Sequence, residues 1–334
     1  MTYPTPPPDP QVPPPAYGAT AARDAMGAIR EEIAKVVVGQ DGVVSGLIAA
    51  LLTRGHVLLE GVPGVAKTLV VKALSAAMSL DFARVQFTPD LMPSDVTGQS
   101  VFNQRDGSFS FRAGPVFCNL LLADEINRTP PKTQAALLEA MEEHQVSVEG
   151  ATRPLPDPFM VIATQNPVEY EGTYPLPEAQ LDRFLFKLLV GYPTFEQEAE
   201  ILHRHHLGLD PHDVQASGVR AVASAADLAQ ARREVEAIVV EPPVIQYVTQ
   251  LCRATRESPS VDLGVSPRGA AATLRAAKSW AWLSGRDFVT PDEVKAVAKP
   301  AMRHRLMIRP ELELEGTTAD GVLDAVLATV PAPR

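Results

Sequence analysis

One eight-residue segment, Gly61-Val62-Pro63-Gly64-Val65-Ala66-Lys67-Thr68, constrains the fold of this chain more than any other. It follows a short apolar stretch, 56–60, that predicts a strand, and it leads into a predicted helix, 67–78. Glycines let the backbone N–H groups of such a loop point at phosphate oxygens, and the N-terminus of the following helix adds positive potential. The segment therefore predicts a phosphate-binding loop, in which Lys67 contacts the β- and γ-phosphates of a nucleoside triphosphate and Thr68 binds Mg²⁺.

One position of the loop departs from the common pattern, which places glycine directly before the lysine. Ala66 stands there instead. Alanine is the smallest replacement for glycine, and Gly64 remains to permit the turn, so the interpretation holds. We expect the cofactor-binding set to run through the whole loop to Leu69, with Mg-ATP as the nucleotide.

Two further apolar segments, 119–123 and 159–164, predict strands that end in polar residues. Asp124 follows the first and would hold Mg²⁺ through water, and Glu125 would orient and deprotonate the attacking water. Asn166 follows the second and could bind the γ-phosphate or that water. Asn-Pro is also an ordinary signal for a turn, so this third motif is weak alone.

The pattern of elements predicts the domain organisation. Up to about residue 193, short strands alternate with helices, which is typical of a parallel sheet with helices on both faces. Two hairpins interrupt it, one at 101–111 with its turn at Asp106-Gly107 and one at 146–155. Beyond residue 193 we expect helices at 195–207, 224–237, 242–256, 267–284 and 291–303. The predicted regions are a disordered proline-rich leader (1–18), an α/β nucleotide-binding domain (19–193) and a smaller all-α domain (194–334).

Composition narrows the function classes. The formal net charge of −10 argues against a nucleic-acid binder, which usually presents a basic face. No apolar run reaches the roughly 18 residues of a membrane span, and the N-terminus lacks the pattern of a secretory signal. Cys118 and Cys252 are far apart in the sequence and are expected to be reduced, buried thiols. These features predict a cytoplasmic protein.

Two arginines are candidates for contact with a phosphate. Arg183, next to Asp182, could reach the γ-phosphate of a neighbouring subunit, but a surface ion pair explains these two residues at least as well. Arg268 lies in the first turn of a predicted helix, where a cation is mildly unfavourable. An anionic partner such as a nucleotide phosphate is therefore expected there.

The order of these motifs resembles that of the AAA+ ATPases, and specifically of the MoxR family, over about residues 20–334. The resemblance rests on Val38-Gly39-Gln40, Gly61–Thr68, Gln86–Asp95, Asp124–Arg128, Gln165-Asn166-Pro167, Gly172–Phe184, Ser266-Pro267-Arg268 and the ending Val322-Leu323-Asp324. It implies an AAA+ P-loop core with two hairpin inserts, followed by a helical lid. It further implies that Asn166 is sensor 1, Arg183 an arginine finger acting in trans, and Arg268 sensor 2, and that Val38 and Gly39 contact adenine.

The resemblance also implies an activity. It implies that this chain is a chaperone-like ATPase that remodels a protein partner. It also implies a hexameric ring in which the hairpins face the pore or the substrate. The implied partners are other copies of the chain and a client or von Willebrand factor A-domain protein. A nucleic-acid motor and a metal-chelatase motor subunit remain open, because both use the same core. A small-molecule kinase would leave the distant arginines without a role. His203, His205 and His206 form a basic cluster on the predicted helix 195–207, but no cysteine or acidic residue stands at ligand spacing, so a metal site is not expected there.

Overall fold

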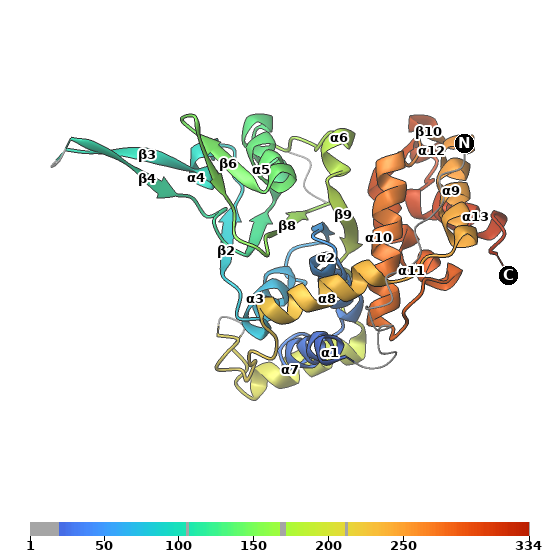
Figure 1. Cartoon of the computed structure of the whole chain (residues 1–334), viewed down its shortest axis with the longest axis horizontal. Coiled ribbons are helices and arrows are strands. Elements are labelled where there is room, and N and C mark those ends of the chain that lie inside the picture. The colour runs from blue at the N-terminus through green and yellow to red at the C-terminus, as the bar shows by residue number, and fades with distance from the viewer. Residues whose placement is uncertain (1–19, 105–106, 168–171, 211–212, 334) are drawn as a thin grey trace, which may run out of the picture.

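The computed structural model describes residues 20–104, 107–167, 172–210 and 213–333. The predicted leader (1–18) and the predicted turn residue Asp106 lie outside the described residues. The described chain forms an α/β region and a helical region side by side, and one hairpin projects from the α/β region (Figure 1).

A five-stranded sheet forms the centre of the α/β region. Its order is β2-β5-β8-β1-β9, and all neighbouring pairs are parallel. The strands are β1 (His56–Glu60), β2 (Phe82–Gln86), β5 (Leu120–Asp124), β8 (Met160–Gln165) and β9 (Phe184–Leu189). Strands β1, β5 and β8 were predicted to within one residue, whereas β9 was not predicted. Its six residues lie at the edge of the sheet, where Lys187 forms an ion pair with Glu60 at 2.7 Å.

Helices cover both faces of the sheet, as predicted, because alternate strand residues point to opposite sides. Leu120 and Leu122 belong to one apolar core and Leu121 to another. The first core includes residues of α1 (Ala21–Ala34), α2 (Asp41–Leu52), α3 (Lys67–Ala77) and α8 (Ala225–Ala237) and continues into the later helices, whereas the second core contains residues of α5 (Pro131–Glu143) and the short α4 (Pro93–Thr97). The fold class is thus α/β, with a parallel sheet between two layers of helices, as the sequence predicted.

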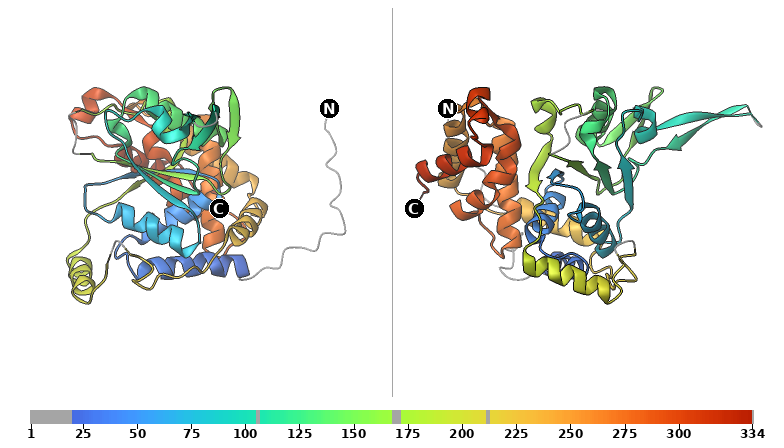
Figure 2. Two further views of the ribbon diagram at one scale, coloured as in Figure 1. Left: turned by 90° about the vertical axis from the view of Figure 1, so that its left-hand side faces the viewer. Right: turned by 180° about the vertical axis from the view of Figure 1, so that it is seen from behind.

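Both predicted hairpins are present. They are β3 (Gly98–Asn103) with β4 (Ser108–Ala113), and β6 (Gln145–Val148) with β7 (Ala151–Pro154). The β3–β4 hairpin projects far from the body of the molecule, as Figure 1 and the right-hand view of Figure 2 show. Phe102 and Phe109 contact each other across it, with ring centroids 5.1 Å apart and ring planes tilted by 53°, although 50% and 71% of their surfaces are exposed.

The region after residue 193 is mainly helical, as predicted. In addition to α8 it contains α7 (Phe195–His206), α9 (Pro242–Glu257), α10 (Pro267–Leu283) and α11 (Pro291–Met302), and the unpredicted α12 (Pro310–Leu314) and α13 (Ala319–Thr329). The short α6 (Glu178–Leu181) precedes β9. The strands β10 (Val261–Leu263) and β11 (Met307–Ile308) pair antiparallel, so this region is not purely α-helical as expected. The pairing joins two extended connections that are too short to carry a recognisable strand pattern.

The first two helices after residue 193 contact the α/β region. Arg204 of α7 donates to the carbonyls of Ala34 and Lys35 at 2.7 and 2.8 Å. Arg232 of α8 donates to the carbonyl of Leu51 at 3.0 Å. The domain boundary predicted at residue 194 stays a prediction.

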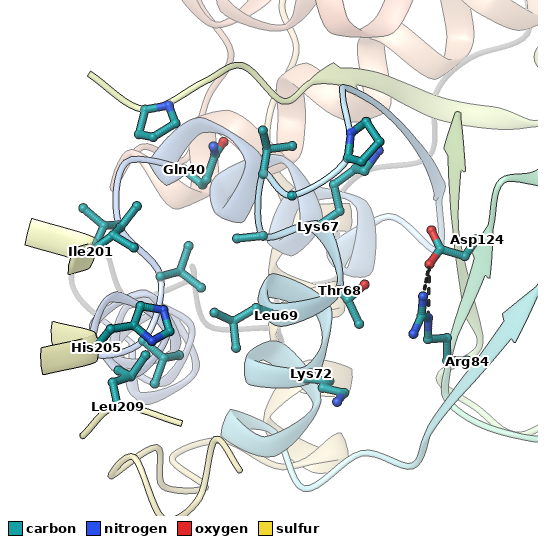
Figure 3. Close-up of a pocket in the computed structure, with 18 of the residues that line it drawn as sticks. Gln40, Lys67, Thr68, Leu69, Lys72, Arg84, Asp124, Ile201, His205 and Leu209 are labelled. Carbon is teal, nitrogen blue, oxygen red and sulfur yellow. Dashed lines mark hydrogen bonds and ion pairs between the residues drawn. The ribbon is translucent and has the colours of Figure 1, made fainter. Parts of the chain in front are cut away.

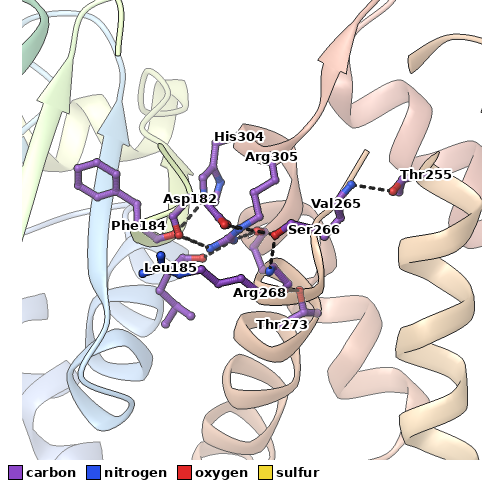
Figure 4. A network of polar contacts seen from close by, with 12 residues as sticks. Asp182, Phe184, Leu185, Thr255, Val265, Ser266, Arg268, Thr273, His304 and Arg305 are labelled. Carbon is purple, nitrogen blue, oxygen red and sulfur yellow. Dashed lines mark hydrogen bonds and ion pairs between the residues drawn. The ribbon is translucent and has the colours of Figure 1, made fainter. Parts of the chain in front are cut away.

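A buried arginine joins the later helices to the sheet. Arg305 contacts Asp182 Oδ1 through Nε at 2.5 Å and donates through a terminal nitrogen to the carbonyl of Phe184 at 2.8 Å. Ser266 Oγ also donates to Asp182, at 3.3 Å. Figure 4 shows these side chains meeting between the end of α6, β9 and the start of α10. The segment that carries Arg183 is therefore fixed from both sides.

Cys118 and Cys252 are buried and free, in agreement with the sequence prediction. Burial raises the pKa of the Cys118 thiol to about 12 and that of the Cys252 thiol to about 11. Within the described residues, none of the helices is both long and apolar enough to cross a membrane.

A buried histidine of β1 gives the first testable prediction. The ring of His56 accepts from Val161 N–H at Nδ1 (3.0 Å) and contacts the carbonyl of Met141 through Nε2 (3.1 Å), which requires the neutral ring with its proton on Nε2. Burial lowers the pKa of His56 from 6.5 to about 4. Below pH 6.5, His56 binds a proton in the unfolded chain, whereas in the folded chain it does so only near pH 4. The free energy of unfolding should therefore fall by about 3 kcal/mol as the pH falls from 6.5 to about 4.

Urea unfolding at about pH 7.5 and about pH 4.5 measures this loss. The variant His56→Gln should be less stable than the wild type at the higher pH, yet lose less stability on acidification. An identical loss in both proteins would show that His56 does not carry the effect.

Candidate functional site

The carboxyl ends of the parallel strands bring the predicted site together. The phosphate loop follows β1, Asp124 ends β5, and Asn166 lies just beyond β8. Parallel strands place these ends at one edge of the sheet. A pocket of about 570 Å³ lies there, and its walls include Lys67, Thr68, Asp124, Glu125 and Asn166. Figure 3 shows Lys67 and Thr68 on one side of it and Asp124 on the other.

The backbone of the loop suits an anion. Gly64 and Ala66 both have positive φ, at 85° and 62°, so the alanine adopts a conformation that costs an L-residue roughly 1–2 kcal/mol. A Cβ added to Gly61 would collide with the carbonyl oxygen of Val190. The following helix, α3, has no side-chain cap and no acidic residue in its first turn. Its first N–H groups are thus available to a phosphate.

Lys67 and Thr68 begin α3 directly at the loop. The ammonium nitrogen of Lys67 lies 2.5 Å from the carbonyl oxygen of Gly61, so it is held over the loop. The loop residues Pro63 to Leu69 all line the pocket, whereas Gly61 and Val62 of the predicted set do not.

A buried threonine of β8 holds the two predicted acids. The hydroxyl of Thr164 donates to Asp124 Oδ1 at 2.6 Å and accepts from the backbone N–H of Glu125 at 2.9 Å. Thr164 has no exposed surface. Glu125 itself has φ 57°, a strained conformation of the kind that occurs at functional sites. One hydroxyl therefore fixes both acids relative to β8.

Residues of β2 contact the same acids and were not among the predicted site residues. Arg84 binds Asp124 Oδ2 through Nε (3.1 Å) and a terminal nitrogen (2.6 Å). Gln86 donates to Glu125 Oε2 at 2.7 Å, and Arg128 pairs with the same oxygen at 3.0 Å. The signal in the sequence was the alternation of Arg84 and Gln86 near the end of an otherwise apolar strand.

The oxygen donors present fit magnesium. Mg²⁺ prefers carboxylate and hydroxyl oxygens and usually retains several waters. Thr68 and Asp124 supply these groups from facing walls of the pocket. Arg84 holds one oxygen of Asp124, so a cation bound there would compete with that guanidinium.

The other end of the pocket is more apolar and fits a nucleobase. Its lining includes Val36, Val37, Val38, Leu69, Ile201, His205 and Leu209. Figure 3 shows Ile201, His205 and Leu209 opposite Leu69. Val38 is where the sequence placed it, but Gly39 lines a neighbouring hollow instead. The residues of α7 were missed because their contact with α1 depends on tertiary packing, and His205 was considered only as part of a histidine cluster.

The two predicted arginines both bind Glu142, outside this pocket. Arg183 Nε lies 2.9 Å from Glu142 Oε2, and Arg268 pairs with Glu142 Oε1 at 3.2 Å. Both line a separate cleft of about 200 Å³, together with Arg275 and Arg305. Neither arginine lines the pocket of the phosphate loop within the same chain.

Two protein-family models match the chain. The model of the "ATPase family associated with various cellular activities (AAA)" matches residues 56–186, and an "AAA lid domain" matches residues 253–326. The first contains the phosphate loop and both acids, and the second contains Arg268.

Full-length relatives agree with these matches. The chain is 48% identical over 308 residues to the uncharacterised protein YeaC of Bacillus subtilis, covering 92% of this chain and 95% of that protein. It is 43% identical over 312 residues to the chaperone MoxR1 of Mycobacterium tuberculosis, covering 91% and 81%. A crystal structure from Cytophaga hutchinsonii, provisionally named an ATPase, is 41% identical with a TM-score of 0.86, covering 94% of this chain and 96% of that one.

The position of Thr164 gives the second prediction. Thr164→Val keeps the shape of the side chain but removes both hydrogen bonds to the acids. We expect ATP turnover to fall roughly 10-fold to 100-fold, because a small misplacement of catalytic groups is that costly. Thr164→Ser retains the hydroxyl and should keep most activity. Wild-type turnover in the valine variant, measured by phosphate release, would contradict the bridging role.

Proposed function

The chain belongs to the MoxR family of AAA+ ATPases, and we propose that it hydrolyses Mg-ATP in a ring of identical subunits to remodel or activate a protein partner. The observation that carries the proposal is the separation of two groups of side chains. The pocket of the phosphate loop holds the groups that bind and activate ATP, while the arginines suited to a γ-phosphate occupy a cleft elsewhere in the chain.

The pocket supplies the first half of the proposed site. The loop and Lys67 bind the phosphates, and Thr68 with Asp124 holds Mg²⁺, which neutralises charge on the phosphates when bound. Glu125 accepts the proton of the attacking water, and Asn166 orients that water or the γ-phosphate. The apolar end around Val38 holds adenine. These roles are supported by the shared lining of one pocket.

A neighbouring subunit supplies the second half. Head-to-tail contacts between identical subunits close into rings and place one face of each copy against the other face of the next. In such a ring Arg183 and Arg268 would approach the γ-phosphate of the adjacent copy. Arginine fingers are worth roughly 10³–10⁵ in rate. A lone subunit should accordingly bind ATP but turn it over slowly.

The partner is proposed to be a protein. The relative MoxR1 is named a chaperone, and the projecting β3–β4 hairpin exposes Phe102 and Phe109. Aromatic side chains are enriched at protein interfaces. We propose a hexamer in the cytoplasm with a client or a von Willebrand factor A-domain protein as partner, as expected from the family.

Removal of the finger gives the third prediction. Arg183→Ala should retain ATP binding within about twofold, because Arg183 lies outside the pocket, but should lose turnover by roughly 10³-fold or more. Binding is measured with a fluorescent ATP analogue and turnover by phosphate release.

Arg253→Ala is the matched control, because Arg253 is an exposed arginine whose carboxylate contact is Glu257 on its own helix. It should behave as the wild type. Full turnover in Arg183→Ala would refute the assignment of a finger in trans.

A further inference from the structure

We propose that Glu142 is a positioning residue that sets Arg183 and Arg268 for the neighbouring nucleotide and couples them to the β6–β7 hairpin. The inference rests on the proposed function, in which these arginines act on ATP bound by the next subunit. Glu142 is neither a ligand of the nucleotide pocket nor a residue singled out by the sequence.

The carboxylate joins three elements that are distant in the sequence. Glu142 belongs to α5, Arg183 follows α6, and Arg268 begins α10 of the helical region. Each oxygen binds a different arginine, at 2.9 and 3.2 Å. A single side chain thus sets the distance between two guanidinium groups that would otherwise repel each other.

The contacts leave nitrogen atoms for a second anion. Within the part of the chain that the structure describes, Arg183 pairs with Glu142 through Nε and Arg268 through one terminal nitrogen. A guanidinium group carries five N–H donors in a fixed plane. Each arginine can therefore bind the carboxylate and a phosphate oxygen at the same time. Glu142 would thus orient the two arginines toward a phosphate without blocking them.

Positive charge is concentrated around this carboxylate. Arg275 and Arg305 line the same cleft. The pKa of Arg305 is lowered, chiefly by burial and further by the charges of Arg268 and Arg275. Since Asp182 is engaged by Arg305, Glu142 is the acid that remains for Arg183 and Arg268.

The end of α5 links Glu142 to the hairpin. The carbonyl of Met141 is held by His56 at 3.1 Å. On the other side, the N–H of Leu155 donates to the carbonyl of His144 at 3.0 Å and closes the base of the hairpin. β6 begins at Gln145, three residues after Glu142, so the hairpin and the carboxylate that binds both arginines are joined by one short segment.

The kinetics of variants that remove the charge of Glu142 test the positioning role. We expect Glu142→Gln and Glu142→Ala to lower kcat roughly 10-fold to 100-fold, the cost of a small misplacement of catalytic groups, with KM for ATP changed less than about twofold. Glu142→Asp should be intermediate, because the shorter side chain cannot reach both arginines. The double variant Glu142→Ala/Arg183→Ala should be no slower than Arg183→Ala, since Glu142 acts through the arginines.

The neighbouring Glu143→Gln is the matched control, because Glu143 is an exposed residue of the same helix turn, and its kcat should be that of the wild type. Wild-type kcat in Glu142→Ala beside an inactive Arg183→Ala would overturn the role of Glu142 and leave the proposed function standing. Full activity in Arg183→Ala would instead refute the proposed function itself.

A label on the hairpin tests the coupling. Thr152 is exposed on β7, and both native thiols are buried with raised pKa values, so Thr152→Cys can be modified selectively. In a Glu125→Gln protein, which lacks the proposed base and should keep ATP bound, addition of ATP should change the fluorescence of an environment-sensitive dye at this position. The further substitution Glu142→Gln in the same protein should abolish that change. An unaltered response would show that the hairpin does not communicate through Glu142.

Discussion

The parallel alignment of β1, β5 and β8 is the constraint on which the rest of the structure depends. Parallel strands require crossover connections, and here these are helices that bury both faces of the sheet. The same alignment puts the ends of the three strands at one edge. Lys67, Asp124 and Asn166 therefore line one pocket although about 100 residues separate the first from the last.

Hydrogen bonds between neighbouring strands then set the fine geometry of that edge. Thr164 holds the acids from β8, and Arg84 and Gln86 hold them from β2. Asp124 and Glu125 are thus fixed from both sides of β5 before any ligand binds. Such fixed polar groups are the means by which active sites avoid reorganisation during a reaction.

The sequence was sufficient for features encoded within a few residues. The loop, the strands β1, β5 and β8 and the helix α3 all depend on local pattern, and their bounds were predicted closely. The strand β9 was not predicted. Arg84, His205 and Glu142 were also missed, because each acquires its role from neighbours far away in the chain. Arg183 illustrates the limit: a pair with Asp182 was considered, whereas Asp182 binds Arg305 and Arg183 binds Glu142.

The central claim is that one active site is divided between two copies of the chain, and mixing two inactive variants tests it most directly. Glu125→Gln lacks the base but keeps its arginines, and Arg183→Ala lacks the finger but keeps its pocket. Each alone should show little phosphate release. An active interface needs the intact pocket of an Arg183→Ala subunit beside the intact arginine of a Glu125→Gln subunit. Random mixing in equal amounts should form about a quarter of the interfaces in this way and restore up to about a quarter of wild-type activity. Activity of the mixture no greater than the sum of its components, after subunit exchange is verified, would contradict the account.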